Sequence, residues 1–330
     1  MPLKVTTKKD DSTFSFGDVS NSGTVVGAKG GTEMMMEGLV QRLPETLTEQ
    51  FNIIPSRVRD VSEDKHNILW LHDLFQDPEV NHLKDPKSRE RFKKLIFVSN
   101  WQFSTYHFGL GVPYRESLVL KNAIEPLPDH TKPKDRINLI YHTTPHRGLE
   151  LLVPAFEHIC SDLSGTHDLH LDVYSSFDIY GWGQRDEPFK PLFQRIKDHP
   201  KMSYHGARPN SEVRKALEDA HIFAYPSIWQ ETSCIALIEA MSARCAVVHP
   251  SLAALPETSA GFGLQYPWHE DPSEHINHFA YVLKMAISNY HDTQHQEKLK
   301  FQKMYIDNFY NWDLRAAEWR GLLESIVASN

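Results

Sequence analysis

The sequence predicts an α/β protein made of two domains, each with a parallel sheet covered by helices. The chain has 330 residues, which suits two domains of ordinary size better than one. In both halves, short apolar runs typical of buried strands alternate with helical patterns, as they do in parallel sheets. Between the halves, residues 124–136 are rich in proline and charge and are typical of a linker.

The first half opens with a polar lead-in over residues 1–22, in which a short strand at 13–16 is the one regular element expected. A glycine-rich run at 27–33 follows, and the next ten residues, MMMEGLVQRL, have the composition of a helix. Four strands are then expected, at 51–54, 67–71, 94–98 and 118–120.

The second half repeats the alternation after the linker. Strands are expected at 137–141, 169–174, 202–204, 222–225 and 246–248. Helices are expected at 149–159, 187–197, 210–218, 272–290 and over most of 295–325. Asn210 or Ser211 is expected to cap the helix that begins at 210, because short polar side chains accept hydrogen bonds from the first free N–H groups.

Polar residues follow several of these strands. His72, Ser99, Asn122, His142 and Glu231 all come after an expected strand. Ligands of parallel α/β sheets bind at the carboxyl ends of the strands. We therefore expect these residues to lie at the functional edges of the two sheets.

The stretch 225–243 is the most informative of the chain, because it holds Glu231 and Glu239 with seven residues between them. A small, turn-prone run leads into good helix formers, so Glu231 should precede a helix and Glu239 should lie about two turns inside it. The free N–H groups at such a helix start bind phosphate well. A carboxylate on either side suits hydroxyl-rich groups, a sugar and a ribose, which together outline a nucleotide-sugar pocket.

The four residues directly after Glu231 would contact phosphate through their backbone N–H groups. These residues are Thr232, Ser233, Cys234 and Ile235. The alternative for Glu239 is an exposed helix residue, and for Glu231 an acid favoured by the helix dipole.

Two other side chains are candidates for the chemistry. Arg147 precedes a glycine and a helix, where it would clamp a leaving diphosphate; the alternative is a solvated loop arginine. His72 ends a buried strand, where it either serves a ligand or simply caps the end of its strand. His142 is a secondary candidate as a neutral phosphate donor.

Composition excludes several classes of function. The net charge of −8 (35 basic against 43 acidic residues) gives no global attraction to nucleic acid or anionic lipid. No apolar run approaches the roughly 20 residues that a membrane span needs, and the N-terminus has no signal-peptide core. Three cysteines without a CxxC pair favour a reduced, cytoplasmic setting. No HExxH or similar signature indicates a metal site.

Taken in order, these segments resemble the retaining glycosyltransferases of family 4, which have the GT-B fold of two Rossmann-like domains facing across a cleft. The resemblance covers most of residues 27–325. The matching segments are 30–33, 68–73, 97–101, 119–124, Arg147-Gly148, 204–206, the Glu231–Glu239 signature, 255–257, and Trp312 with 316–319.

The resemblance implies a division into an acceptor-side domain at 1–126, a nucleotide-sugar domain at 127–310 and a last helix at 311–330 that packs back on the first domain. It implies transfer of a sugar from a nucleotide-diphosphate sugar to a glycan or other hydroxyl acceptor, with retention and without a metal or other cofactor. Arg147, Glu231 and His72 would be catalytic. The donor would also contact Gly30, Gly31, His142, Arg208, Thr232, Ser233, Cys234, Ile235 and Glu239.

The chain departs from the family pattern in three places. Tyr141-His142 stands where the family has Gly-Arg, Ala243-Arg244 stands where a glycine is usual, and the first domain is short. Two alternatives stay open: a nucleotide-sugar epimerase of the same fold, and a non-catalytic nucleotide-sugar-binding scaffold. A nicotinamide oxidoreductase is the weakest, because the glycines at 27–31 lack the G-x-G-x-x-G spacing.

Overall fold

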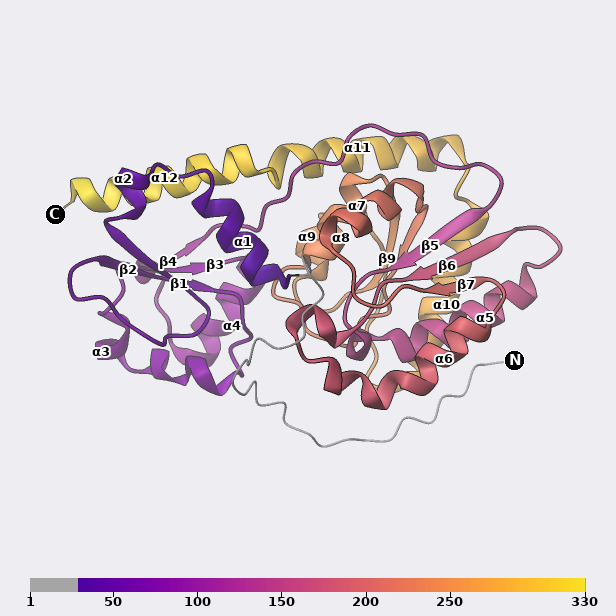
Figure 1. Cartoon of the computed structure of the whole chain (residues 1–330), viewed down its shortest axis with the longest axis horizontal. Helices are drawn as coiled ribbons and strands as arrows, with labels where there is room; N and C mark the ends of the chain where they lie inside the picture. Colours follow the sequence, from indigo (N-terminus) through magenta and orange to yellow (C-terminus); the bar gives the residue numbers. More distant parts are fainter. Residues whose placement is uncertain (1–28, 330) are drawn as a thin grey trace.

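The computed structural model describes residues 29–329, so the strand expected at 13–16 lies outside the described residues. Figure 1 shows two lobes side by side, each built around one sheet, with α11 and α12 running one after the other along the same side of both. The strands of each sheet are all parallel to their neighbours. The predicted α/β architecture with two parallel sheets is therefore confirmed.

The first sheet has four strands in the order β1-β2-β3-β4. They are β1 (Phe51–Pro55), β2 (His66–Leu71), β3 (Lys94–Phe97) and β4 (Ser117–Val119), each within a residue or so of the range expected. Side chains alternate across the pleat of β2: Ile68 and Trp70 join one apolar cluster, and Leu69 and Leu71 join the other. Both faces of this sheet are thus buried, as in other parallel sheets.

The helices around the first sheet were predicted less well. They are α1 (Gly31–Val40), α2 (Glu45–Thr48), α3 (Pro86–Arg89) and α4 (Asn100–Leu110), with 3₁₀ turns η1 (Pro78–Lys84) and η2 (Tyr114–Glu116). Helix α1 begins at Gly31, three residues before the start that composition predicted. Helix α4 was not predicted, although Ser99 caps it by accepting a hydrogen bond from the Gln102 N–H.

The second sheet has six strands in the order β10-β9-β8-β5-β6-β7. They are β5 (Ile137–Tyr141), β6 (Leu169–Val173), β7 (Met202–Tyr204), β8 (Ile222–Ala224), β9 (Ala246–Pro250) and β10 (Leu264–Tyr266). Five were expected, and β10 was not. The strand order reverses beside β5, and such a switch point opens a crevice at the carboxyl ends of the strands.

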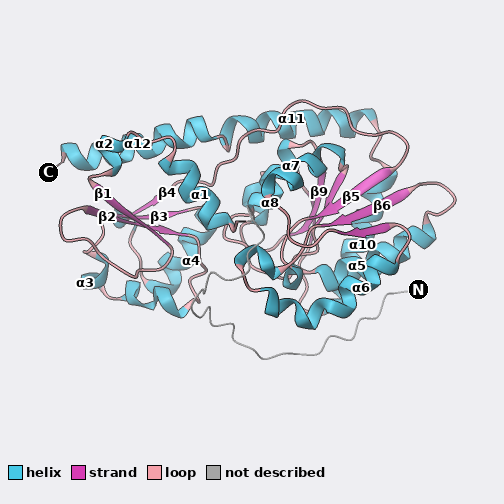
Figure 2. Ribbon diagram, viewed as in Figure 1, coloured by secondary structure: helices cyan, strands magenta, loops and turns pink. Residues whose placement is uncertain are grey.

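Helices cover both faces of the second sheet. Figure 2 shows α7 and α8 on one side of it and α5 and α6 on the other. The helices of this half of the chain, of which the last packs on the first sheet, are α5 (Leu149–Asp162), α6 (Lys190–Asp198), α7 (Asn210–Asp219), α8 (Ile235–Ser242), α9 (Leu255–Ser259), α10 (Pro272–Ser288), α11 (Thr293–Phe309) and α12 (Trp312–Ala328), with 3₁₀ turns η3 (Pro145–Arg147), η4 (Phe177–Tyr180) and η5 (Gly183–Phe189).

Three predictions for these helices were wrong in detail. The helix expected at 187–197 begins as the 3₁₀ turn η5, which contains Pro188. The helix expected over 295–325 is two helices, separated at Tyr310 and restarted by Asn311, whose side chain caps α12. Neither Asn210 nor Ser211 caps α7: the capping position is Pro209, and no side chain caps the helix.

The C-terminal helix α12 packs on the first sheet. Trp312, Trp319 and Leu323 belong to the same apolar cluster as Leu39 of α1 and Trp70 of β2. The rings of Trp70 and Trp319 meet edge to face with centroids 4.8 Å apart. The domain limits at 126 and 310 stay predictions.

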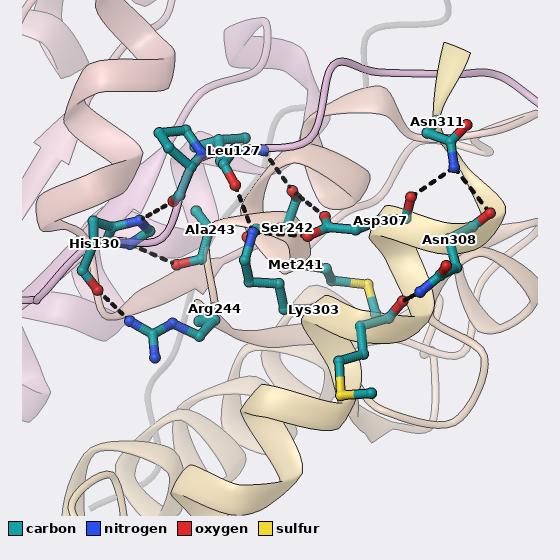
Figure 3. Close-up of polar contacts among 12 residues, drawn as sticks. Leu127, His130, Met241, Ser242, Ala243, Arg244, Lys303, Asp307, Asn308 and Asn311 are labelled. Carbon is teal, nitrogen blue, oxygen red and sulfur yellow. Dashed lines mark hydrogen bonds and ion pairs between the residues drawn. The ribbon is translucent and has the colours of Figure 1, made fainter. Parts of the chain in front are cut away.

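The segment between the sheets is held against the second domain. The Leu127 N–H donates to Ser242 Oγ at the end of α8 (2.9 Å), and Ser242 Oγ donates to Asp307 of α11 (2.6 Å) (Figure 3). His130 contacts the Ala243 carbonyl, and Arg244 donates to the His130 carbonyl. These contacts attach the linker to the end of α8, the helix that carries Glu239.

Candidate functional site

The turn between β5 and α5 places Arg147 at the carboxyl edge of the second sheet. Gly148 ends this turn at φ +119°, and a Cβ there would lie 2.2 Å from the Pro226 carbonyl oxygen. Only glycine fits that position, because both the backbone angle and the contact exclude a side chain. In the Arg147-Gly148 pair, the backbone of the turn thus requires the glycine, and the arginine supplies the charge.

Arg147 pairs with Glu231 across the edge of the sheet. Its Nη1 lies 2.7 Å from Glu231 Oε1, and the Tyr225 hydroxyl donates to the same oxygen. The side chains of Arg147 and Glu231 are 23% and 7% exposed, so the pair is largely out of water. Burial alone would lower the pKa of Arg147, but the facing Glu231 raises it well above its ordinary value. The guanidinium therefore stays charged.

Several buried polar atoms near this pair have no hydrogen-bond partner within residues 29–329. They are His142 Nε2, Thr144 Oγ1, His146 Nδ1, Arg147 Nε and, from the first domain, His72 Nε2. Buried polar groups are nearly always hydrogen-bonded in folded proteins, so these atoms have the capacity to bond to a polar ligand. Burial lowers the pKa of His72, His142 and His146 to about 3, which keeps all three rings neutral at ordinary pH.

The start of α8 meets the start of α1 from the other domain. A Cβ on Gly31, the first residue of α1, would lie 3.1 Å from the Ile235 side chain, the first of α8. A Cβ on Gly30 would lie 2.5 Å from the ring of Tyr180. The missing side chains thus allow two helix N-termini, each with free N–H groups, to approach one another. Figure 1 shows α1 reaching toward the second lobe in this way.

The run ahead of α8 also contacts the first domain. Thr232 Oγ1 donates to the carbonyl oxygen of His72 at 2.8 Å, and the His72 N–H donates to Ser56 Oγ. Ser233 and Cys234 follow, and Cys234 is buried at the capping position of α8. The structure therefore brings together His72, Gly30, Gly31, His142, Arg147, and the run Glu231, Thr232, Ser233, Cys234 and Ile235.

Glu239 lies apart from this group. It is the fifth residue of α8, so it is about one turn inside the helix and not two, as the sequence suggested. It is 3% exposed, and its oxygens accept hydrogen bonds from Asn210 and Arg214 of α7. Burial raises the pKa of Glu239, and Arg214 and Asn210 oppose that rise.

Arg208 is not joined to the other predicted site residues by any contact within residues 29–329. It lies in the loop after β7, is exposed, and pairs with Glu212 at 3.7 Å. Lys29, next to Gly30, pairs with Glu37 of α1.

Four functional-site neighbours were not predicted from the sequence: Asn210, Arg214, Tyr225 and Glu257. Glu257 of α9 accepts hydrogen bonds from the N–H groups of Asn100 (3.0 Å) and Trp101 (2.9 Å), at the start of α4 in the other domain. Of these four residues, only Glu257 could have been found from the sequence, because it lies in the 255–257 segment that matches the family pattern. Asn210 and Arg214 are a plain i, i+4 pair on a polar helix, and nothing local relates them to α8.

Two cavities of the described chain lie elsewhere. One of about 570 Å³ is lined by residues 191–200 on α6 and the turn after it. Another of about 540 Å³ lies between α7, the start of β5 and the end of β6, with Asp135, Arg136, Asp172 and Lys215 among its lining residues. Neither includes Arg147 or Glu231. Within residues 29–329 no three His, Cys, Asp or Glu side chains are placed to hold a metal ion, and no helix there has the length and apolarity to cross a bilayer.

Comparison with known proteins finds similarity in the second half of the chain. Residues 138–283, less than half of the chain, match the family model described as Glycosyl transferases group 1. A subunit of the human phosphatidylinositol N-acetylglucosaminyltransferase is 27% identical over 144 residues, which are 42% of this chain and 28% of that protein. The chain therefore matches less than a third of that curated relative.

Solved structures are similar over both domains. A glycosyltransferase from Rickettsia africae superposes with a TM-score of 0.68 over 95% of this chain and 85% of its own, at 12% identity. Sucrose-phosphate synthase from Thermosynechococcus elongatus superposes with a TM-score of 0.64 over 85% of this chain and 74% of its own, at 14% identity. The pneumococcal O-GlcNAc transferase GtfA, solved with UDP and GlcNAc, superposes with a TM-score of 0.62 over 80% of this chain and 53% of its own, at 13% identity. These likenesses confirm the GT-B fold.

Proposed function

We propose that this protein transfers a sugar from a nucleotide-diphosphate sugar to an acceptor hydroxyl, with the donor held at the carboxyl edge of the second sheet. The observation that carries the proposal is the buried Arg147–Glu231 pair beside the N-terminus of α8, with Gly31 of the other domain opposite. The match of residues 138–283 to Glycosyl transferases group 1 supports it.

The proposed chemistry follows from where charge develops. As the bond between the anomeric carbon and the diphosphate oxygen breaks, negative charge builds on the leaving diphosphate. Arg147 retains a buried Nε–H that has no partner in the described part of the chain, and the backbone N–H groups at the start of α8 point out of the helix end. Preorganised donors of this kind, in a site with little water, stabilise the transition state strongly. His142, which is neutral and buried, would add a further contact.

The two glutamates would have different partners. Glu231 uses Oε1 for Arg147 and Tyr225, and its Oε2 has no partner within the described residues, so Oε2 would accept a sugar hydroxyl. Glu239, one turn further along α8, would accept from the ribose. His72 would hydrogen-bond to the transferred sugar from the first domain, and Arg208 would lie toward the base.

Retention of the anomeric configuration and independence of metal are also part of the proposal, and they rest on the resemblance to family 4. In this scheme the acceptor hydroxyl attacks from the face that the diphosphate leaves. The new bond to the anomeric carbon forms as the old one breaks, and the acceptor proton passes to the departing diphosphate oxygen. No carboxylate nucleophile is required.

The curated relative narrows the first choice of donor sugar. Its name specifies N-acetylglucosaminyl transfer, so nucleotide-activated N-acetylglucosamine is the first donor to examine. The acceptor class is proposed only as a glycan or another hydroxyl compound.

The proposal is tested by following release of nucleoside diphosphate and formation of glycoside, with UDP-, GDP-, ADP- and dTDP-sugars and an acceptor panel, with and without EDTA. Acceptor-dependent release that EDTA leaves unchanged, with an α-linked product from an α-linked donor, is expected. Interconversion of the donor sugar without an acceptor would instead identify an epimerase. Donor binding without turnover across the panel would contradict the proposal in favour of a binding scaffold.

A further inference from the structure

Helix α7 turns two side chains toward Glu239, and the proposed function gives neither of them a role. Asn210 and Arg214 are one turn apart on α7, and both donate to the Glu239 carboxylate. We infer that Arg214, assisted by Asn210, is a positioning residue that holds Glu239 in the orientation that binds the donor ribose. This inference rests on the proposed function.

Glu239 needs such a partner because of its burial. It is 3% exposed, and an ionised carboxylate in that position is costly unless it is paired and hydrogen-bonded. Arg214 Nη1 lies 3.0 Å from Oε1, and Asn210 Nδ2 lies 3.2 Å from Oε1 and 3.1 Å from Oε2. Together they keep a charged acceptor inside the fold and fix the plane of its carboxylate.

These contacts leave Glu239 able to bind a ligand. An ionised carboxylate has about four acceptor positions, and the contacts to Arg214 and Asn210 use at most three of them. Oε2 accepts only from Asn210 within the described residues. Oε2 is therefore the atom placed to accept from a hydroxyl group.

The spacing on α8 fits a nucleotide. Glu239 lies four residues beyond Ile235, which is about 6 Å along the helix axis. The proposed phosphate contacts are at the Ile235 end. A ribose joined to that diphosphate would thus lie alongside the next turn, where Glu239 is.

Arg214 is itself held at a second point. Its Nη2 donates to the carbonyl oxygen of Glu125 in the linker at 2.8 Å. Leu127 then joins the linker to Ser242 of α8. The guanidinium thus bridges Glu239 and the linker with two nitrogens in a fixed fork, which a lysine ammonium would not reproduce.

The test compares ribose with deoxyribose. Titration calorimetry of the full chain measures the affinities for UDP and 2′-deoxy-UDP, ADP and 2′-deoxy-ADP, and GDP and 2′-deoxy-GDP. For the base that binds, the ratio of the two dissociation constants is the ribose preference. The wild type is expected to prefer the ribonucleotide by about tenfold or more, as expected for a hydrogen bond to a charged group. Arg214→Met should reduce that preference to within about twofold and leave the 2′-deoxy affinity unchanged.

Matched variants separate positioning from general loss of structure. Glu239→Gln should lose the preference as Arg214→Met does, and combining the two should add little, because both act through one contact. Arg214→Lys should retain part of the preference. Lys215→Met, an exposed neighbour on α7, should retain all of it. If Arg214→Met does not fold, Asn210→Ala and Arg214→Lys still test the inference, and each should lower the preference.

Three results would count against the inference. A folded Arg214→Met protein that keeps the wild-type ribose preference would overturn it. Nucleotide binding by the wild type without any ribose preference would overturn it and leave the proposed function standing. Failure of the wild type to bind any of these diphosphates would overturn the proposed function as well.

Discussion

The carboxyl edges of the two sheets differ in their polar and charged side chains. At the edge of the first sheet, Ser99 caps α4, and the backbone of His72 bonds to the side chains of Ser56 and Thr232. Arg57 pairs there with Asp77 at 3.3 Å, where the two side chains are 21% and 12% exposed. At the edge of the second sheet, Arg147, Tyr225 and Glu231 form a buried charged network with unpartnered donors beside it.

This difference indicates a division of labour. Binding of an anion needs charges that are already paired, oriented and out of water, and within the described residues the second edge has them. The first domain contributes close backbone approach at Gly30 and Gly31 and one neutral ring at His72. We therefore expect donor binding to depend on the second domain, and the first domain to matter for stability, acceptor placement and turnover.

The largest expected effect is a loss of stability in the first domain and not in the second. Trp319 of α12 is fully buried against Trp70, so Trp319→Ala should cost about 3–5 kcal/mol in the first domain. Hydrogen exchange followed by mass spectrometry should show faster exchange in β2 and little change in β5. Trp319→Phe is the control and should be milder, because it keeps most of the ring. Equal acceleration in both sheets would show that the two domains unfold as one unit.

The next effect compares the two edges through catalysis. Arg147→Met should lower kcat by roughly 10²–10³-fold, because it removes a preorganised donor to the leaving diphosphate. His72→Gln should lower kcat by about tenfold and leave donor affinity nearly unchanged, because the neutral contact that it removes strengthens as the sugar is transferred. Steady-state kinetics with Arg115→Met, an exposed change in the first domain, provide the control. A larger loss at His72 than at Arg147 would reverse the proposed division.

A third prediction uses pH to sharpen the comparison. His142 and His146 in the second domain, and His72 in the first, have a folded pKa lowered to about 3 by burial, against 6.5 when unfolded. The unfolded chain binds more protons between these values, so stability falls as pH drops below 6.5. The loss at pH 5 should be roughly 1–2 kcal/mol per histidine. Urea unfolding of His142→Gln should show a flatter dependence than the wild type, and an unchanged slope would contradict the assignment.

The smallest effect concerns the contact between domains. Hydrogen bonds from the first turn of α4 lower the pKa of Glu257 despite its partial burial. A lowered carboxyl pKa stabilises the folded state above the unfolded value of 4.5, and this contribution is lost as pH falls below it. Glu257→Gln should weaken the contact by about 1 kcal/mol and raise the radius of gyration slightly in small-angle scattering. A radius unchanged from the wild type would show that other contacts hold the domains together.

Much of the fold could be predicted from the sequence because its strands are buried, apolar and punctuated by turns. The strand β10 was missed because it has three residues with an exposed Gln265 at its centre. Helix α4 was missed because its aromatic and polar residues show no helical amphipathic pattern. Short edge elements like these are stabilised by tertiary packing, which a local pattern does not reveal.

The candidate site was predictable in part. Arg147 and Glu231 are 84 residues apart, and their placement on one ligand was expected only from the ordered resemblance to a family. The partners of Glu239 were not predicted, since Arg214 looks like any cation on a surface helix. Only the packing of α7 against α8 turns it toward a buried carboxylate. The cytoplasmic setting stays a prediction.

The most direct test of donor binding at the second edge is a crystal structure of the chain with the nucleoside diphosphate that binds most tightly. We expect the β-phosphate within hydrogen-bonding distance of the Arg147 guanidinium and of backbone N–H groups at the start of α8, with the ribose beside Glu239. A nucleotide bound instead in the cavity of about 540 Å³ beside Asp135 and Lys215, away from Arg147, would contradict this placement.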